Sequence, residues 1–186
     1  MRIIEEIEKY IKLTDSNISL ITDSVELQTI DKNTNLIDAG ESNNFIGFVE
    51  EGLLRSYKID ELGNDITCHF FEQGSFFTDL FSYNKIDKIS VSIEPVINSK
   101  VYIISDESLK DFELKIDSWN RFALEYYQMK TACLLNFQNK IKTCSANQAY
   151  SLFNKYYKYA TQFSSKKHIA SFLGISRYTI SRSKLN

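Results

Sequence analysis

The spacing of hydrophobic residues changes twice along the 186 residues of this chain. Residues 2–13 carry isoleucines at helical spacing with acidic residues between them, which predicts an amphipathic helix, and residues 15–22 predict a second short helix. From about residue 25 the pattern shifts to short segments rich in β-branched and aromatic residues, which predict strands. These strands are 25–30, 45–49, 53–59, 66–71, 89–93 and 101–104, with a hairpin turn at Gly63 and Asn64. Many short strands favour a β-sandwich or jelly roll.

A second change, near residue 106, returns the pattern to helix. Ser105 and the acidic residues after it predict a helix start, and a long helix is predicted over residues 117–144. Its apolar residues step by three and four, as in a coiled coil; they are Trp119, Phe122, Tyr126, Met129 and Cys133, continued by Phe137 and Ile141. This stripe fits either packing on the β-domain or a dimer seam. Because the helix would span roughly 40 Å, more than one small β-domain covers, we expect the seam. Residues 145–160 predict one further helix.

Charge divides the chain into two unequal parts. All 24 Asp and Glu and 12 of the 22 Lys and Arg lie in residues 1–125, which carry a net charge of −12. Residues 126–186 hold the other 10 Lys and Arg and no acidic residue, so they carry +10. This asymmetry suggests two different roles, and the basic end is a candidate for binding a polyanion such as DNA.

The basic end contains a helix-turn-helix pattern in the stretch KKHIASFLGISRYTISRSKL, residues 166–185. Ile169, Ala170 and Leu173 form the inner face of a first helix, Gly174 makes the turn, and Ile180 anchors a second helix. In such a motif the N-terminal side chains of the second helix meet base edges in the major groove. The DNA-binding residues we expect are Lys166, Lys167, Ser176, Arg177, Tyr178, Ser181, Arg182 and Lys184, with Ser176 also capping the second helix. An ordinary helical hairpin is the alternative.

A β-roll, a long helix and then residues 169–182 (IASFLGISRYTISR) resemble the Crp/Fnr family of bacterial transcription regulators. Residues 50–55 (EEGLLR) resemble the family's strand turn, and the short C-terminal end resembles a branch common in Bacteroidetes. The resemblance implies an α+β protein with an antiparallel β-roll of the cyclic nucleotide-binding type (1–116), a dimerisation helix (117–144) and a helix-turn-helix region (145–186). It also implies a homodimer on a palindromic promoter site in double-stranded DNA, with RNA polymerase as a further partner. Tyr178 stands where many members carry Glu, so base preference is not carried over.

The resemblance also places an effector pocket. Members that bind cyclic AMP hold its ribose with a Phe-Gly-Glu-Leu-like segment, which Phe77, Thr78, Asp79 and Leu80 match with Gly and Glu replaced. They hold its phosphate with an Arg-Ser/Thr-Ala segment, which Ile89, Ser90 and Val91 match without the arginine; Lys88 is adjacent. A phosphate would lose a charge-assisted partner there, so we expect no binding of cyclic AMP. The effector, if one exists, is another small molecule, and a ligand-free dimerisation scaffold is the alternative.

The remaining residue types argue against other classes of protein. The β-region holds only His69, whereas a cupin-like enzyme usually needs two or more histidines and a glutamate, so we expect no enzyme, metal or cofactor. Cys68, Cys133 and Cys144 have long spacings and are expected to be buried free thiols. No apolar run approaches the roughly 18 residues of a membrane span, and the N-terminus resembles no secretion signal, so we expect a cytoplasmic protein without a membrane partner.

Overall fold

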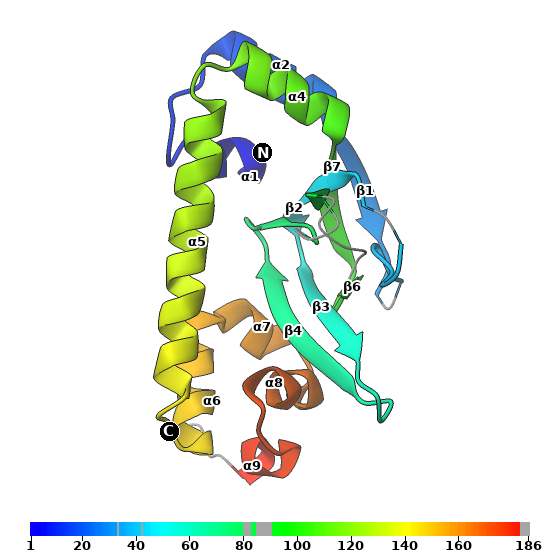
Figure 1. Cartoon of the computed structure of the whole chain (residues 1–186), viewed down its shortest axis with the longest axis vertical. Helices are drawn as coiled ribbons and strands as arrows, with labels where there is room; N and C mark the ends of the chain where they lie inside the picture. Colours follow the sequence, from blue (N-terminus) through cyan, green and yellow to red (C-terminus); the bar gives the residue numbers. More distant parts are fainter. Residues whose placement is uncertain (33, 42, 80–82, 85–90, 183–186) are drawn as a thin grey trace.

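Two stacked antiparallel sheets and a set of surrounding helices make up the molecule. The computed structural model (Figure 1) describes residues 1–32, 34–41, 43–79, 83–84 and 91–182. The strands are β1 (Glu26–Ile30), β2 (Phe45–Glu51), β3 (Leu53–Ile59), β4 (Asp65–Glu72), β5 (Phe76–Phe77), β6 (Ser92–Pro95) and β7 (Ser99–Ser105). The strand order is β1-β7-β2-β5 in one sheet and β4-β3-β6 in the other. The jelly-roll-like pattern of short antiparallel strands is therefore confirmed, and Gly63 makes the β3–β4 turn with a positive φ of 79°.

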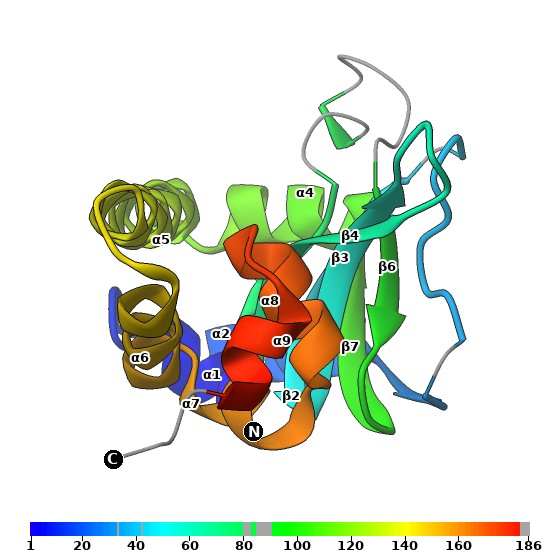
Figure 2. The same cartoon turned by 90° about the horizontal axis from the view of Figure 1, so that it is seen from below.

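The helices are α1 (Arg2–Ile7), α2 (Asp15–Ser24), α4 (Asp106–Lys115), α5 (Trp119–Ile141), α6 (Ala146–Tyr156), α7 (Lys158–Phe163), α8 (Lys166–Leu173) and α9 (Arg177–Arg182). As Figure 1 shows, α5 runs the length of the molecule, from α4 at one end to α6 at the other. The described α9 helix lies at the α6 end, in front of α8 when the molecule is seen from below (Figure 2).

The space between the two sheets is filled by alternate strand residues. Val49, Leu54, Phe77 and Ile93 meet there and are fully or almost fully buried. Gly47 on β2 lies against the Phe77 ring so closely that a Cβ atom would lie 2.0 Å from ring atom Cζ. Glycine at position 47 therefore allows the β2 and β5 strands to pair with Phe77 pointing into the core.

The predicted coiled-coil seam is wrong for most of its residues. Trp119, Phe122, Tyr126 and Phe137 are each less than 5% exposed within the single chain. The first three pack with α1, α2, α4 and β2, and the Tyr126 hydroxyl accepts a hydrogen bond from the Phe76 amide at 2.9 Å. The single chain covers more of α5 than the β-domain alone would, because the C-terminal helices pack on α5 as well as the N-terminal helices do.

Three further expectations from the sequence need correction. The first helix ends at Ile7 rather than residue 13, although Ile11 remains buried in the following turn. The predicted helix over 145–160 is two helices, because Tyr157 adopts a non-helical conformation (φ −122°, ψ 60°) between α6 and α7. The cysteines are free, but Cys68 and Cys133 are exposed rather than buried.

The C-terminal helices share a hydrophobic core with the β-domain. Leu53, Phe70 and Val96 of the β-domain pack with Phe153 of α6 and Phe137 of α5, and with apolar residues of α8 and α9. The helix-turn-helix region is therefore held against the sheet that contains β3 and β4.

Candidate nucleic-acid interface and ligand cavity

The predicted helix-turn-helix is present as α8, a glycine turn and α9. Ile169, Ala170, Leu173 and Ile180 are buried, as the pattern predicted. Gly174 has a φ of 65°, and the amides of Gly174 and Ile175 donate to the carbonyls of Ser171 and Ala170 at 3.2 and 3.0 Å. These two bonds form a Schellman-type helix end, which requires a left-handed residue that glycine supplies without strain.

The start of α9 presents three of the expected DNA-binding residues to solvent. Ser176 caps the helix by accepting a hydrogen bond from the Tyr178 amide at 3.2 Å, which confirms the predicted cap. Ser176, Arg177 and Tyr178 are exposed, Tyr178 by 66%. The Arg177 guanidinium lies 5.3 Å from the centre of the Tyr178 ring, so the two side chains form one cationic and aromatic surface.

Two lysines lie at the start of α8, the first helix of the same helix-turn-helix. Lys166 and Lys167 are exposed, and Ser165 caps α8 by accepting from the His168 amide at 3.2 Å. Of the other expected DNA-binding residues, Ser181 and Arg182 lie in α9, but their side chains are not described, and Lys184 lies outside the described residues.

A small cavity of about 150 Å³ lies between β4, β5 and α5. Its wall includes Phe77 and Thr78, two of the expected effector residues, together with His69, Tyr126 and Lys130. The sequence pattern did not associate Tyr126 and Lys130 with this site, because they lie on α5, some fifty residues further along the chain. The aromatic stripe was the only signal for Tyr126, and it fits packing equally well; Lys130 is not part of that stripe and carried no signal of its own.

Apart from Phe77 and Thr78, none of the expected effector residues that the structure describes lines this cavity. Thr78 donates from its hydroxyl to the Phe45 carbonyl at 3.0 Å and accepts from the Asn43 side chain at 2.7 Å, so its hydroxyl is used within the protein. Asp79 is buried, and it is absent from the residues lining the cavity. Leu80, Lys88, Ile89 and Ser90 lie outside the described residues.

His69 is held in its neutral form at neutral pH. Burial, with the nearby Lys130 ammonium as a second cause, lowers the pKa of His69 from its ordinary value of 6.5 to about 4. Its ring packs edge-on against Phe71, with centroids 4.8 Å apart. The neutral imidazole and the aromatic rings make most of the wall apolar, and Lys130 adds a charged group to it.

A larger groove of about 450 Å³ lies along the first half of α5. Its lining is mostly apolar and includes Ile46, Phe76, Trp119, Phe122 and Tyr126. Within the described residues no cluster of three or more His, Cys, Asp or Glu side chains could hold a metal ion. Among the helices described, none combines the length and apolar character that crossing a bilayer would require.

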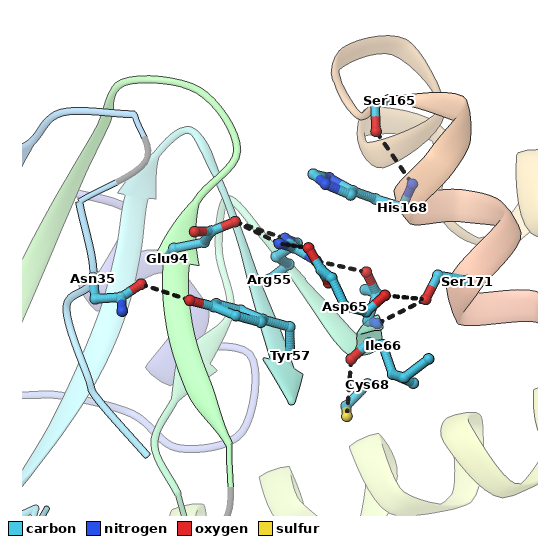
Figure 3. A network of polar contacts seen from close by, with 11 residues as sticks. Asn35, Arg55, Tyr57, Asp65, Ile66, Cys68, Glu94, Ser165, His168 and Ser171 are labelled. Carbon is cyan, nitrogen blue, oxygen red and sulfur yellow. Dashed lines mark hydrogen bonds and ion pairs between the residues drawn. The ribbon is translucent and has the colours of Figure 1, made fainter. Parts of the chain in front are cut away.

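Arg55, the last residue of the EEGLLR segment, lies at the centre of a buried polar network (Figure 3). Its guanidinium donates two hydrogen bonds to the Asp65 carboxylate at 2.6 and 2.7 Å. It also donates to Glu94 at 2.8 Å and to the Thr67 hydroxyl at 2.9 Å. The Arg55 hydrogen bonds hold the pKa of Asp65 below its ordinary value. The network fastens β3 to β4 on one side and to β6 on the other.

Comparison with solved structures shows the same fold in bacterial regulators, whereas no protein family profile and no curated protein matches the sequence. A protein described as a transcriptional regulator of the Crp/Fnr family from Eubacterium rectale superposes with a TM-score of 0.67 at 20% identity, over 92% of this chain and 82% of that one. FixK2 from Bradyrhizobium japonicum gives 0.70 at 16% identity, over 86% and 82%. The c-di-GMP responsive global regulator CLP from Xanthomonas campestris gives 0.68 at 13% identity, over 91% and 89%. The chain therefore has the fold of the Crp/Fnr regulators, with a β-roll, a long helix and C-terminal helices.

Proposed function

We propose that the protein is a DNA-binding transcription regulator that acts in the cytoplasm. The observation that carries this proposal is the exposed start of α9, with Ser176, Arg177 and Tyr178 presented at one end of the molecule. An arginine at the N-terminal end of a recognition helix can read guanine through two hydrogen bonds. The fold shared with solved regulators supports the same function. In this proposal the regulator acts together with RNA polymerase.

The electrostatics of the C-terminal region support binding to the DNA backbone. Lys166 and Lys167 are exposed, and residues 126–186 contain no carboxylate side chain that could repel phosphates. Phosphate contacts supply most of the affinity for DNA of any sequence. We assign phosphate binding to Lys166 and Lys167, and base recognition to Arg177, with Arg182 and Lys184 as further cationic residues of this end.

The active form in this proposal is a homodimer through α5. Most of the predicted seam is buried inside the chain, although Met129 and Cys133 are exposed. The opposite face of α5 leaves Leu124 58% exposed and Leu135 52% exposed. These two leucines lie eleven residues apart, which is about three helical turns, so they share one face. Pairing α5 with a second copy would cover both and would bring two α9 helices to half-sites about 34 Å apart.

The ligand of the β-domain is proposed to be something other than cyclic AMP. A cavity of about 150 Å³ is well below the roughly 300–1,000 Å³ of usual small-molecule sites. This size favours a small apolar ligand, or the alternative in which the β-roll is a dimerisation scaffold without a ligand. Loss of a charged partner for the phosphate costs about 1.5–3 kcal/mol, at least tenfold in affinity. Calorimetry with cyclic AMP tests this, and a micromolar dissociation constant would contradict it.

The experiment that tests the function is selection of bound sequences from random duplex DNA by the purified full chain, with and without a metabolite extract. We expect enrichment of a palindrome, and loss of Arg177 in an Arg177→Ala variant should relax the preference at one position of each half-site. Sedimentation of a Leu124→Glu/Leu135→Glu variant tests the dimer, which it should dissociate. If the wild-type chain binds neither the selected pool nor scrambled DNA at low salt, the regulator function is wrong.

A further inference from the structure

Among the strands that the structure describes, β4 lies at the edge of its sheet, with β3 as its one neighbour. An edge strand leaves main-chain N–H and C=O groups without a neighbouring strand to bind, and such groups need another hydrogen-bond partner when they are buried. Ser171 of α8 supplies it: the Ser171 hydroxyl accepts from the Thr67 amide at 3.0 Å and donates to the Asp65 carbonyl at 3.1 Å. One side chain of the helix-turn-helix thus takes the place of a neighbouring strand (Figure 3).

The other end of β4 holds a second helix of the same region. The Glu72 carboxylate accepts from the Ala160 amide at 2.7 Å and from the Tyr159 amide, in the first turn of α7. These amides have no partner within their own helix, so Glu72 satisfies groups that would otherwise need water. Glu72 thereby caps the helix that begins after the non-helical Tyr157.

Between these two polar contacts, aromatic packing closes the interface. Phe70 of β4 is almost fully buried and lies 5.4 Å from the Phe172 ring of α8 and 5.7 Å from the Phe153 ring of α6. Aromatic pairs at these distances and at steep interplanar angles add stabilisation beyond the area they bury. The C-terminal helices are therefore fixed to β4 at both ends and in the middle.

The same stretch of β4 is braced from its other side. Arg55 binds the side chains of Asp65 and Thr67, the two residues whose main-chain groups bind Ser171. Arg55 is only 2% exposed, and the five N–H donors on its three guanidinium nitrogens form a rigid planar fork. The groups that Ser171 binds are consequently held at a fixed spacing by a residue of the neighbouring strand.

We propose that the edge of β4 is the positioning element of the helix-turn-helix, with Ser171 and Glu72 as positioning residues, and that this docked arrangement is the one that binds DNA. The inference rests on the proposed DNA-binding function. In the docked arrangement Ser176, Arg177 and Tyr178 are all exposed, so the β-domain does not cover the start of the recognition helix. Docking therefore leaves the start of α9 accessible to DNA. It also fixes the orientation of the helix-turn-helix region relative to the β-domain, so that binding to the duplex does not have to fix it.

The test compares Ser171→Ala and Glu72→Ala in the full chain with Ser151→Ala as the matched control, since Ser151 is an exposed serine on α6. Amide hydrogen exchange followed by NMR reports docking directly. In Ser171→Ala the Thr67 amide should exchange about tenfold faster or more, as expected for loss of a hydrogen bond worth on the order of 1.4 kcal/mol. In Glu72→Ala the Ala160 amide should respond in the same way. Amides between β3 and β6 and both amides in the control should keep their wild-type rates.

The functional part of the test is titration of the selected duplex with each variant. Affinity should fall about threefold to tenfold for Ser171→Ala and Glu72→Ala, with unchanged base preference and an intact dimer in sedimentation. Unchanged Thr67 exchange in Ser171→Ala would overturn the docking role. Faster exchange together with unchanged or tighter DNA binding would overturn the assignment of the docked arrangement as the DNA-binding one. If wild type binds no duplex, the proposed function fails by itself, and the exchange rates still decide whether Ser171 and Glu72 hold the helices.

Discussion

Arg55 is the residue on which the β3–β4–β6 sheet depends most for its polar contacts. Its side chain and those of Asp65 and Glu94 are 3%, 21% and 14% exposed, so water screens these ion pairs only weakly. Removing one member of a buried pair leaves the others charged and unpaired, which typically costs about 3–5 kcal/mol. We expect Arg55→Met to lower the free energy of unfolding by about 3 kcal/mol or more in urea titrations.

The matched control for Arg55→Met is Lys100→Met. Lys100 pairs with Glu51 at 3.0 Å, but both side chains are at least half exposed. Exposed pairs contribute about 0–1 kcal/mol, so Lys100→Met should change the unfolding free energy by less than about 1 kcal/mol. Equal effects of the two substitutions would show that Arg55 contributes no more than a surface residue does.

His69 makes the free energy of unfolding depend on pH in the acidic range. Its folded-state pKa is lowered by burial to about 4, while the unfolded chain binds a proton near 6.5. As pH falls below 6.5 the unfolded state takes up a proton that the folded state refuses, so the free energy of unfolding decreases until about pH 4. The loss is at most roughly 3 kcal/mol at about 1.36 kcal/mol per pKa unit.

Urea titrations of wild type and His69→Phe between about pH 7 and pH 4 measure this contribution. Phenylalanine keeps an aromatic ring beside Phe71 and cannot be protonated. We expect the variant to lose less stability over this range than wild type. Parallel curves would mean that His69 binds its proton equally in the folded and unfolded states.

Gly174 and Gly47 are required for different reasons: Gly174 adopts a positive φ in a turn, whereas Gly47 leaves room for a neighbouring ring. Gly174 has a φ of 65°, and no atom lies within 4 Å of the place that a Cβ would take, so Gly174→Ala should cost only the backbone strain of about 1–2 kcal/mol. Gly47 lies where a Cβ would meet the Phe77 ring at 2.0–2.6 Å. Gly47→Ala should therefore cost more, on the order of 3 kcal/mol, because the ring must move out of a packed core. Urea titration ranks the two, and a larger loss for Gly174→Ala would contradict the packing argument.

Sequence patterns predict the elements well where the signal is local. The short β-branched and aromatic segments, the Ser105 and Ser176 caps and the Gly174 turn depend on neighbours within a few residues, and the structure confirms them. The break between α6 and α7 was not predictable in this way. At this break the Glu72 carboxylate, 88 residues away in the sequence, accepts a hydrogen bond from the Ala160 amide of α7, a contact that no local pattern reveals.

The seam on α5 failed for a related reason at the level of the whole chain. A stripe of apolar residues at spacings of three and four predicts that something covers it, but it does not say whether the cover is a second copy or another part of the same chain. Trp119, Phe122 and Tyr126 are covered by α4, which directly precedes α5, and by α1 and α2, which lie at the start of the chain. For the same reason the cavity residue Lys130 could not be associated with Phe77 before the fold was known.

The separation of charge along the chain leads to a prediction for the assembled protein on DNA. Residues 126–186 carry +10 and residues 1–125 carry −12, so only one end of the molecule attracts phosphates. For double-stranded DNA, the logarithm of the binding constant falls with the logarithm of salt concentration by about 0.9 for each phosphate neutralised. If Lys166 and Lys167 each neutralise one phosphate in both copies of a dimer, Lys166→Gln/Lys167→Gln should reduce the slope by roughly 3–4.

Titrations of selected and scrambled duplexes at several salt concentrations measure these slopes. Lys110→Gln is the control, because Lys110 is an exposed lysine on α4 that pairs with Asp106 at the far end of the molecule from α9. The double variant should weaken binding to both duplexes alike, since phosphates carry no sequence information. Arg177→Ala should instead narrow the difference between the duplexes by roughly 1–3 kcal/mol per half-site. A salt slope unchanged from wild type in the Lys166→Gln/Lys167→Gln variant would show that the start of α8 does not contact the DNA backbone.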